Sequence, residues 1–302
     1  MTIAVTGATG FVGCALREAA AEQGAELRAL TRRKQPGAAG VEWIEGDLHD
    51  RKALTRLVAK AEAVIHVAGV VNTPDPMGFH LGNVEGTMAL VEAAVAARVP
   101  RFVFVSSLAA REPELSKYGA SKRHAEKLVA ASGLDWTIVR PPAIYGPRDR
   151  EMLEMFRLAK WGVLPMPPQG RASLIHVGDL ATLLLALAPA REDTTRQIYE
   201  PDDGKTGGWS HRELGKAIGW ALGRRPWVPH LSKPMLERVA RLDKAVRGDK
   251  AKLTPDRIGY MVHPDWVSSP RMKPPLDLWM PQTATLDGLR ATAKWYREKG
   301  WL

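Results

Sequence analysis

The chain has 302 residues, 45% of them hydrophobic and 25% charged, with a formal net charge of +10. This composition supplies a substantial apolar core and excludes a disordered chain. Cys14 is the only cysteine, so no intrachain disulfide can form and a reducing compartment is expected. An N-terminal strand leaves no room for a signal peptide, and the longest apolar run, residues 180–190, is too short to span a bilayer. We expect a cytoplasmic protein, soluble or peripheral at the cytoplasmic membrane face.

The first eight-residue motif predicts a site for a dinucleotide. It reads Thr6-Gly7-Ala8-Thr9-Gly10-Phe11-Val12-Gly13 and follows the apolar run Ile3-Ala4-Val5. The first glycine permits a tight strand-to-helix turn, the second lets the backbone approach phosphate oxygens, and the third lets the helix pack closely on the strand. The helix expected at about residues 11–23 directs its free N–H groups and positive dipole end at the anion.

Short β-rich runs alternate with alanine- and leucine-rich helical runs over the first 200 residues. The expected strands are residues 3–6, 26–31, 41–45, 63–67, 101–106, 137–140 and 197–200. This alternation predicts an α/β fold, a Rossmann-type doubly wound parallel sheet covered on both faces by helices. We expect residues 1–200 to form this dinucleotide-binding core, with the segments near 70–82 and 146–172 reaching the substrate side above the strand ends.

A smaller, mostly helical substrate lobe is expected at residues 201–302. Ser210 and Glu213 form a capping box before an apolar run that Gly223 closes. A second amphipathic stretch carries an apolar stripe, and packing of this stripe on the lobe core is favoured over membrane contact. The stripe consists of Met235, Val239, Leu242 and Val246.

The positive charge is concentrated in this lobe. Residues 205–273 hold 15 Lys and Arg against 6 Asp and Glu. No recognition motif accompanies the excess, so we expect no nucleic-acid partner. An anionic membrane or an acidic substrate would suit the charge, and a solvated basic face without a partner is the plain alternative. The segment also contains Trp209, Trp220, Trp227 and Trp266, which we expect to face the membrane if one is bound.

Three side chains form a candidate catalytic group. Tyr118 and Lys122 are four residues apart at the start of a predicted helix, so both project from one face. An ammonium near a phenol favours the phenolate and lowers the pKa of the tyrosine, which suits it to pass a proton near neutrality. Ser107 ends the strand at residues 101–106 and can hydrogen-bond to the same substrate oxygen. We expect no metal ion at this site.

These motifs together resemble the short-chain dehydrogenase/reductase superfamily, in its extended or atypical branch of NAD-dependent epimerases and dehydratases. The resemblance covers residues 1 to about 200. Besides the glycine turn and the catalytic group, it rests on Gly46-Asp47-Leu48, His66-Val67-Ala68-Gly69, Asn83, Val105-Ser106-Ser107 and Arg140-Pro141-Pro142-Ala143-Ile144-Tyr145-Gly146-Pro147.

The resemblance implies a role for each matching residue. Tyr118 would be the general acid/base, Lys122 would tune it and hold the nicotinamide ribose, Ser107 would position the substrate oxygen, and Asp47 would accept from the adenine amino group. The implied cofactor-binding residues are Gly7, Thr9, Gly10, Phe11, Val12, Gly13, Arg32, Arg33, Asp47, Leu48, Val67, Ala68, Gly69, Asn83, Tyr118, Lys122, Pro141, Ala143 and Ile144.

The end of the second strand indicates which cofactor is bound. An NAD-selecting site usually places a carboxylate there for the ribose 2′-hydroxyl. This chain has Arg32 and Arg33 instead, and two guanidiniums suit a 2′-phosphate. We expect NADP(H) in preference to NAD(H), although the arginines could also point into solvent.

The substrate-side segments are apolar and predict a lipophilic substrate. The residues concerned are Val70, Val71, Met77, Phe79, Leu81, Met152, Met155, Phe156 and Met166, several of which could equally be core. Among the branches of the superfamily, the chain resembles the one that contains the dehydrogenase-like accessory subunit of respiratory complex I. That likeness implies a reductase of lipid ketones, among them 3-oxo-sphingolipids such as oxidised ceramide.

Two other functions remain open. A nucleotide-sugar epimerase or dehydratase uses the same motifs, but the gap from Ser107 to Tyr118 is short and little polar surface remains for a sugar diphosphate. A nucleotide-binding structural or sensor protein without turnover would have no chemical need for the catalytic group. No feature of the sequence selects an oligomeric state.

Overall fold

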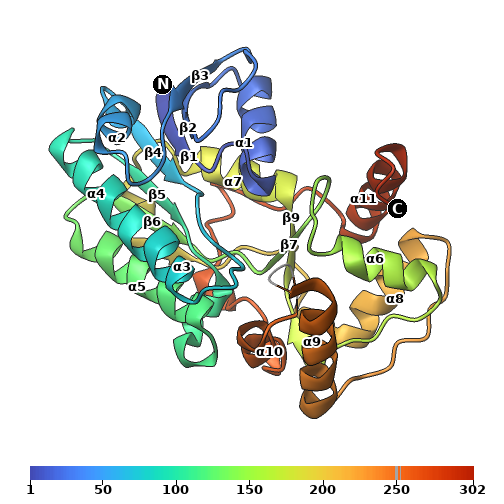
Figure 1. Cartoon of the computed structure of the whole chain (residues 1–302). Helices are drawn as coiled ribbons and strands as arrows, with labels where there is room; N and C mark the ends of the chain where they lie inside the picture. The colour runs from blue at the N-terminus through green and yellow to red at the C-terminus, as the bar shows by residue number, and fades with distance from the viewer. Residues whose placement is uncertain (249–250, 252) are drawn as a thin grey trace. The chain divides into compact units, whose positions relative to one another are not determined.

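The computed structural model describes residues 1–248, 251 and 253–302 (Figure 1). The chain divides into two compact units. The first consists of Met1–Pro141, Leu180–Glu200 and Pro274–Trp279, and the second of Pro142–Asp179, Pro201–Lys273 and Met280–Leu302. The chain thus passes between units at residue 200, where we placed a boundary, but residues 142–179 already belong to the second unit. Each unit has its own apolar core.

The first unit is built on one parallel sheet. Its strands are β1 (Thr2–Thr6), β2 (Glu26–Thr31), β3 (Val41–Glu45), β4 (Ala63–His66), β5 (Phe102–Val105), β6 (Trp136–Val139) and β10 (Gln197–Tyr199). Its helices are α1 (Phe11–Glu22), α2 (Arg51–Val58), α3 (Met77–Phe79), the π-helix η1 (His80–Glu85), α4 (Gly86–Ala96), the 3₁₀ turns η2 (Leu108–Arg111), η3 (Pro113–Leu115) and η4 (Glu192–Thr194), α5 (Lys117–Ala131) and most of α7 (Val177–Ala186).

The strand order confirms the predicted Rossmann-type fold. The order is β10-β6-β5-β4-β1-β2-β3, and every neighbouring pair is parallel. All seven strands lie where the sequence predicted them, within one residue at either end. The order reverses between β1 and β4, and ligands of open α/β sheets bind at such a switch point, beyond the carboxyl ends of the strands.

The central strands are continuous apolar runs because helices cover both faces of the sheet. All four residues of β4, and likewise all four of β5, are buried. Figure 1 shows α4 and α5 side by side against the sheet. Leu90, Val91 and Ala94 of α4, with Ala125 and Val129 of α5, join the strands in one apolar cluster.

The second unit is mostly helical, as expected of a substrate lobe. Its helices are α6 (Leu153–Lys160), α8 (His211–Ala221), α9 (Lys233–Arg247), α10 (Pro255–Met261), the 3₁₀ turn η6 (Pro270–Met272) and α11 (Thr285–Glu298). Its strands are β7 (Ala143–Tyr145), β8 (Arg171–Ala172), β9 (Leu174–His176), β11 (Trp209–Ser210) and β12 (Asp265–Trp266). Strand β7 pairs in parallel with β9, and β8 pairs with both β11 and β12. These strands are too short to show a periodic pattern in the sequence.

The predictions for the two amphipathic stretches of the lobe differ in their outcome. The Ser210–Glu213 capping box is confirmed at the start of α8, whose apolar face is buried. The expectation that the α9 stripe packs on the lobe core is wrong. Helix α9 buries Leu236 and Ala240 instead, and the stripe of four residues faces solvent. In the described part of the chain, the buried residues of α9 lie along one side of the helix. The sequence pattern does not reveal which side of the helix is buried.

No helix in the described part of the chain combines the length and the apolar character needed to cross a bilayer.

Candidate functional site

The glycine turn between β1 and α1 forms a cradle of bare backbone. Gly7 has φ +75°, and a Cβ atom there would lie 2.7 Å from the backbone N of Ala68. A Cβ on Gly13 would lie 2.1 Å from the carbonyl oxygen of Gly7. The N-cap residue, Gly10, gives α1 no side-chain cap, so the N-terminal amides remain for a ligand. The cradle fits a pyrophosphate, because an anion there meets N–H groups and the helix dipole.

The neighbouring strand ends present the residues predicted for adenosine. Arg32 and Arg33 follow buried Thr31 directly, and both side chains are exposed. Exposed Asp47 uses one oxygen, Oδ1, to accept from the amides of His49 and Asp50, at 2.8 and 3.1 Å. Among the described residues, its other oxygen, Oδ2, accepts no hydrogen bond, which agrees with a carboxylate placed to accept from a ligand.

Residues beyond β4 meet η1 and α5. The Asn83 side chain accepts from the Val70 amide at 2.6 Å, and donates to the Val70 carbonyl and to Ser121 Oγ, both at 2.9 Å. A Cβ atom on Gly69 would lie 3.1 Å from Asn83 Oδ1 and 3.6 Å from Lys122 Nζ. The structure therefore brings Gly69, Asn83 and Lys122 together, as the resemblance implied, while Val67 and Ala68 are half-buried beside them.

A chain of hydrogen bonds centred on His66 runs under this region. The Ala68 amide donates to Thr6 Oγ1, which lies 2.6 Å from His66 Nδ1. His66 Nε2 lies 2.9 Å from Thr87 Oγ1, and Thr87 donates to the Asn83 carbonyl. Since both hydroxyls have one other fixed partner, Nδ1 accepts and Nε2 donates, which requires a neutral imidazole. Burial, with Lys122 nearby, lowers the pKa of His66 to about 3.

Lys122 is buried against the end of β5. Its Nζ donates to the Val105 carbonyl at 2.7 Å and lies 4.5 Å from the centre of the Phe104 ring. Burial lowers the pKa of Lys122 to about 8, and the nearby Glu126 carboxylate opposes that shift. The ammonium is therefore charged near neutrality, as the proposed tuning of a tyrosine requires.

Tyr118 is half-buried, one turn before Lys122 on α5. Its ring centre lies 6.0 Å from that of Phe79, which forms an apolar wall beside the phenol. Ser116 caps the helix by accepting from the Gly119 amide at 2.9 Å, and this cap sets the first turn that carries Tyr118.

Ser107 begins η2, the 3₁₀ turn that packs on the start of α5. Its Oγ accepts from the Ala109 amide at 3.2 Å, so its proton remains able to reach a substrate oxygen. A Cβ atom on Gly119 would lie 2.5 Å from the Ala109 carbonyl, so the two turns are in close contact. The three predicted catalytic residues thus come from two elements that pack directly on each other.

A buried ionic cluster anchors α5, and the sequence analysis did not identify it. Glu126 accepts from Ser106 Oγ at 2.6 Å and from Arg140 Nε and Nη2 at 2.8 and 2.7 Å. Arg140 also lies 3.6 Å from Glu200 at the end of β10. The sequence did contain a signal for this cluster. Glu126 lies one turn beyond Lys122 on the same helix, and Arg140 begins the family motif at residues 140–147. Sequence spacing alone could not show that they meet.

The last predicted cofactor residues are divided between the units. Pro141 is the final residue of the first segment of the first unit, and its carbonyl accepts from the Leu108 amide at 3.1 Å. Ala143 and Ile144 lie on β7 of the second unit, exposed and half-buried respectively.

The apolar substrate-side residues divide into exposed and core positions. Val71 and Met77 are exposed between β4 and η1, and Leu81 is exposed on η1 itself, while Phe79 is buried beside Tyr118. Met152, Phe156 and Met166 follow the core alternative that the sequence left open. They are buried in the core of the second unit, and Met155 packs against the same cluster. Helix α6, which carries Met155 and Phe156, needed an apolar face to pack on α8, and the sequence alone could not distinguish that face from a pocket wall.

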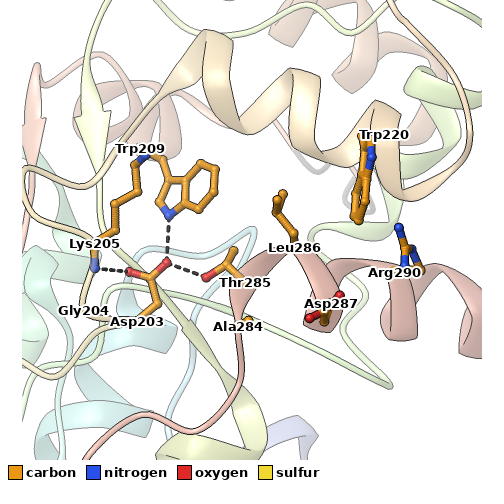
Figure 2. Close-up of a pocket in the computed structure, with 10 residues that line it drawn as sticks. All are labelled: Asp203, Gly204, Lys205, Trp209, Trp220, Ala284, Thr285, Leu286, Asp287 and Arg290. Carbon is orange, nitrogen blue, oxygen red and sulfur yellow. Dashed lines mark hydrogen bonds between the residues drawn. The ribbon is translucent and has the colours of Figure 1, made fainter.

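The second unit has an open hollow of about 550 Å³ lined by Trp209 and Trp220 (Figure 2). Asp203 accepts there from Trp209 Nε1 at 2.7 Å and from Thr285 Oγ1 at 2.5 Å. Arg290 stacks over the Trp220 ring, 4.0 Å from its centre. Trp209 therefore has a structural partner, and elsewhere in the unit Trp266 Nε1 donates to the Tyr260 carbonyl at 2.8 Å. Trp227 is 69% exposed.

Comparisons with known proteins agree with this geometry. The model of the NAD dependent epimerase/dehydratase family matches residues 3–200. The ceramide reductase of Caulobacter vibrioides is 38% identical over 311 residues, a match that covers 99% of this chain and 96% of that protein. A 2-alkyl-3-oxoalkanoate reductase of Stenotrophomonas maltophilia is 32% identical over 205 residues, 59% of each chain.

Solved structures show the same fold over the whole chain. The crystal structure of gox2253 superposes with a TM-score of 0.80 at 25% identity and covers 100% of this chain and 99% of that one. With the family model, the glycine cradle and the Tyr118–Lys122 helix in agreement, the chain belongs to the NAD dependent epimerase/dehydratase family and is an NAD(P)-dependent enzyme of the short-chain dehydrogenase/reductase type.

Proposed function

We propose that this enzyme reduces a ketone on a lipophilic substrate, with NADPH as the preferred reductant and a 3-oxo-sphingolipid such as oxidised ceramide as the substrate class. The observation that carries the proposal is the placement of Tyr118 on α5, one turn before buried Lys122 and near the apolar ring of Phe79. A proton donor with an apolar wall suits a carbonyl on a lipid chain.

Ser107, Tyr118 and Lys122 have separate roles in the proposed reduction. A reduced nicotinamide, when bound, would supply a hydride for the carbonyl carbon. Ser107 would hold the carbonyl oxygen through its hydroxyl proton, and Tyr118 would give its phenolic proton to that oxygen as negative charge develops. Lys122 would stabilise the phenolate that remains and would hold the ribose hydroxyls. Glu126 keeps α5, and so both side chains, in register with the ends of β5 and β6 through Ser106 and Arg140.

Arg32 and Arg33 support the preference for NADPH. Both guanidiniums are exposed at the end of β2, where a ribose 2′-substituent is bound in this architecture. Within the described chain neither has an ion-pair partner, so both remain available to a 2′-phosphate. A bidentate guanidinium recognises phosphate by charge and by geometry.

The apolar residues around the site support a lipid substrate. Val71 and Met77, between β4 and η1, are each 55% exposed, and Leu81, on η1, is 42% exposed. Apolar side chains left exposed beside a catalytic group suit an acyl chain better than a sugar diphosphate. The names of the two reductase relatives, a ceramide reductase and a 2-alkyl-3-oxoalkanoate reductase, support the same substrate class.

A panel of ketones tests the proposal. We expect the protein to consume NADPH with long-chain 3-oxo compounds, faster with oxidised ceramide than with short ketones, and to consume NADH more slowly. Epimerisation or dehydration of a nucleotide sugar without ketone-dependent loss of NADPH would favour the epimerase alternative. NADPH binding without turnover of any of these compounds would favour a structural or sensor role.

The basic second unit further supports peripheral contact with an anionic membrane, from which a lipid substrate would enter. The excess of Lys and Arg over residues 205–273 is the observation in favour. Of the four tryptophans, exposed Trp227 and partly exposed Trp220 remain candidates for contact, whereas Trp209 and Trp266 have indole N–H groups bonded within the fold.

A further inference from the structure

Helix α9 carries an apolar stripe that nothing in the described chain covers. Its four residues are exposed to increasing extents along the helix, Met235 by 47%, Val239 by 44%, Leu242 by 67% and Val246 by 83%. With a rotation of about 100° per residue, these positions fall within about 60° of one another, so they form a single line. The line spans about 16 Å at 1.5 Å per residue.

The side of α9 next to the stripe packs in the fold, because Leu236 lies about 100° around the helix from Met235. Leu236 and Ala240 are buried against Ile258 of α10, and partly buried Leu231 and Val262 complete this small cluster. Figure 1 shows α9 and α10 side by side. A surface helix normally buries its widest apolar face. This one buries two residues and exposes four, which is the arrangement of a helix that lies on another apolar phase.

The charges on α9 complement an anionic surface. The helix carries five basic residues, Lys233, Arg238, Arg241, Lys244 and Arg247, against the two acids Glu237 and Asp243. Arg238 lies about 60° around the helix from Met235, beside the stripe, whereas Glu237 lies about 160° away. Asp243 is neutralised within the fold, because it lies 3.3 Å from Arg247 and accepts from the Leu253 amide.

We propose that the stripe of α9 (Met235, Val239, Leu242 and Val246) inserts into the interface of an anionic lipid bilayer, with Arg238 and Arg241 on the headgroups. The proposal rests on the proposed function in one respect, since a substrate that resides in the membrane would explain why the enzyme binds a bilayer. A second copy of this chain fits less well, because a two-fold contact through the stripe would set two basic helices face to face.

Vesicle sedimentation with the full chain tests the docking surface. We expect binding to phosphatidylcholine vesicles that contain phosphatidylglycerol, weak binding to phosphatidylcholine alone, and loss of binding at high salt. The double variant Leu242→Glu/Val246→Glu should bind the anionic vesicles about tenfold or more weakly, because it replaces inserted apolar groups by carboxylates. Arg238→Gln/Arg241→Gln should weaken binding and reduce its dependence on salt.

The matched control is Val95→Glu/Leu276→Glu, which makes the same two changes at exposed positions of the first unit, 45% and 76% exposed. It should bind vesicles like the unaltered protein. The proposal would be overturned if the control lost vesicle binding as much as Leu242→Glu/Val246→Glu does. Binding without a need for anionic lipid, or no binding at all, would overturn it too. So would a dimer in solution that only the α9 variant dissociates.

Sedimentation needs no turnover, so its outcome is independent of the proposed reaction. A protein that binds anionic vesicles through α9 but reduces no ketone would refute the proposed function and retain the docking surface. The two double variants on α9 should keep NADPH-dependent activity on a short, water-soluble ketone, because α9 carries no residue of the proposed catalytic group.

Discussion

Tyr118 is the residue on which the proposed chemistry depends most. Replacing it by Phe keeps the ring beside Phe79 and removes only the proton donor. We expect turnover to fall about a hundredfold or more, as loss of positioned proton transfer typically does, with NADPH affinity nearly unchanged. Steady-state kinetics and a cofactor titration measure the two effects. Tyr199→Phe is the control, because the Tyr199 hydroxyl donates to the Asp193 carbonyl at 3.0 Å and belongs to no predicted site. Near-normal turnover in Tyr118→Phe would contradict the assignment.

Arg32 and Arg33 test the cofactor preference. The double variant Arg32→Ala/Arg33→Ala should weaken NADPH by about 1.5–3 kcal/mol for each charge-assisted hydrogen bond lost, and NADH by much less. Titration with both cofactors gives the comparison. The exposed Lys34→Ala serves as the control for loss of a neighbouring positive charge. Equal losses for both cofactors would mean that the arginines do not contact a 2′-phosphate.

His66 should make the protein sensitive to acid. Its pKa is about 3 in the fold against an ordinary 6.5, so between these values the unfolded chain binds the extra proton. The contribution of His66 to stability is complete above pH 6.5 and is lost as the pH falls towards 3, at up to about 1.4 kcal/mol per pH unit. Denaturant unfolding at a series of pH values measures the slope. His66→Gln should flatten it, while the exposed His80→Gln should not. An unchanged slope in His66→Gln would place the acid sensitivity elsewhere.

At the scale of the element, α5 combines two of the proposed catalytic residues with a buried anchor. Tyr118, Lys122 and Glu126 recur every four residues, so one helix face presents the proton donor, the cation and the carboxylate in turn. Glu126 ties that face to Ser106 and Arg140, at the ends of the two adjacent strands β5 and β6. The position of the catalytic side chains is thus fixed by an ionic contact one turn beyond them.

The anchor predicts a large cost for its loss. Glu126→Gln leaves buried Arg140 without its closest carboxylate, and we expect the free energy of unfolding to fall by about 3–5 kcal/mol. Because Glu126 raises the pKa of Lys122, the variant should also lose activity at a lower pH than the unaltered enzyme. Arg123→Gln is the control, since Arg123 contacts the same carboxylate at 3.1 Å but is 42% exposed, and its loss should cost no more than about 1 kcal/mol. Equal destabilisation of both variants would contradict a special role for the buried pair.

At the scale of the whole molecule, the cofactor residues lie mainly in the first unit, so NADPH should stabilise that unit. At about a hundred times its dissociation constant, NADPH should add about 2.7 kcal/mol to the free energy of unfolding. Thermal unfolding with and without NADPH measures the effect. Gly13→Val should abolish the gain, because its Cβ would strike the turn that cradles the phosphates. A similar gain in that variant would place the cofactor elsewhere.

The sequence by itself determined the sheet of the first unit and predicted most of its candidate site. The central strands were predicted because fully buried parallel strands are continuous apolar runs, and the glycine turn was recognisable because each of its glycines has a steric reason. Tyr118 and Lys122 were found because a spacing of four places them on one helix face. These features are local, so a linear pattern records them.

Only the tertiary structure decided which polar groups meet and which apolar faces are covered. The contacts of Glu126 with Arg140, and of His66 with Thr6 and Thr87, join residues from different elements, and no linear spacing encodes them. The same holds for apolar stripes. The face of α6 that the sequence left open between pocket and core is core, and the stripe of α9 that was expected in the core is exposed. Periodicity shows that a helix has an apolar face, but only packing determines what that face contacts.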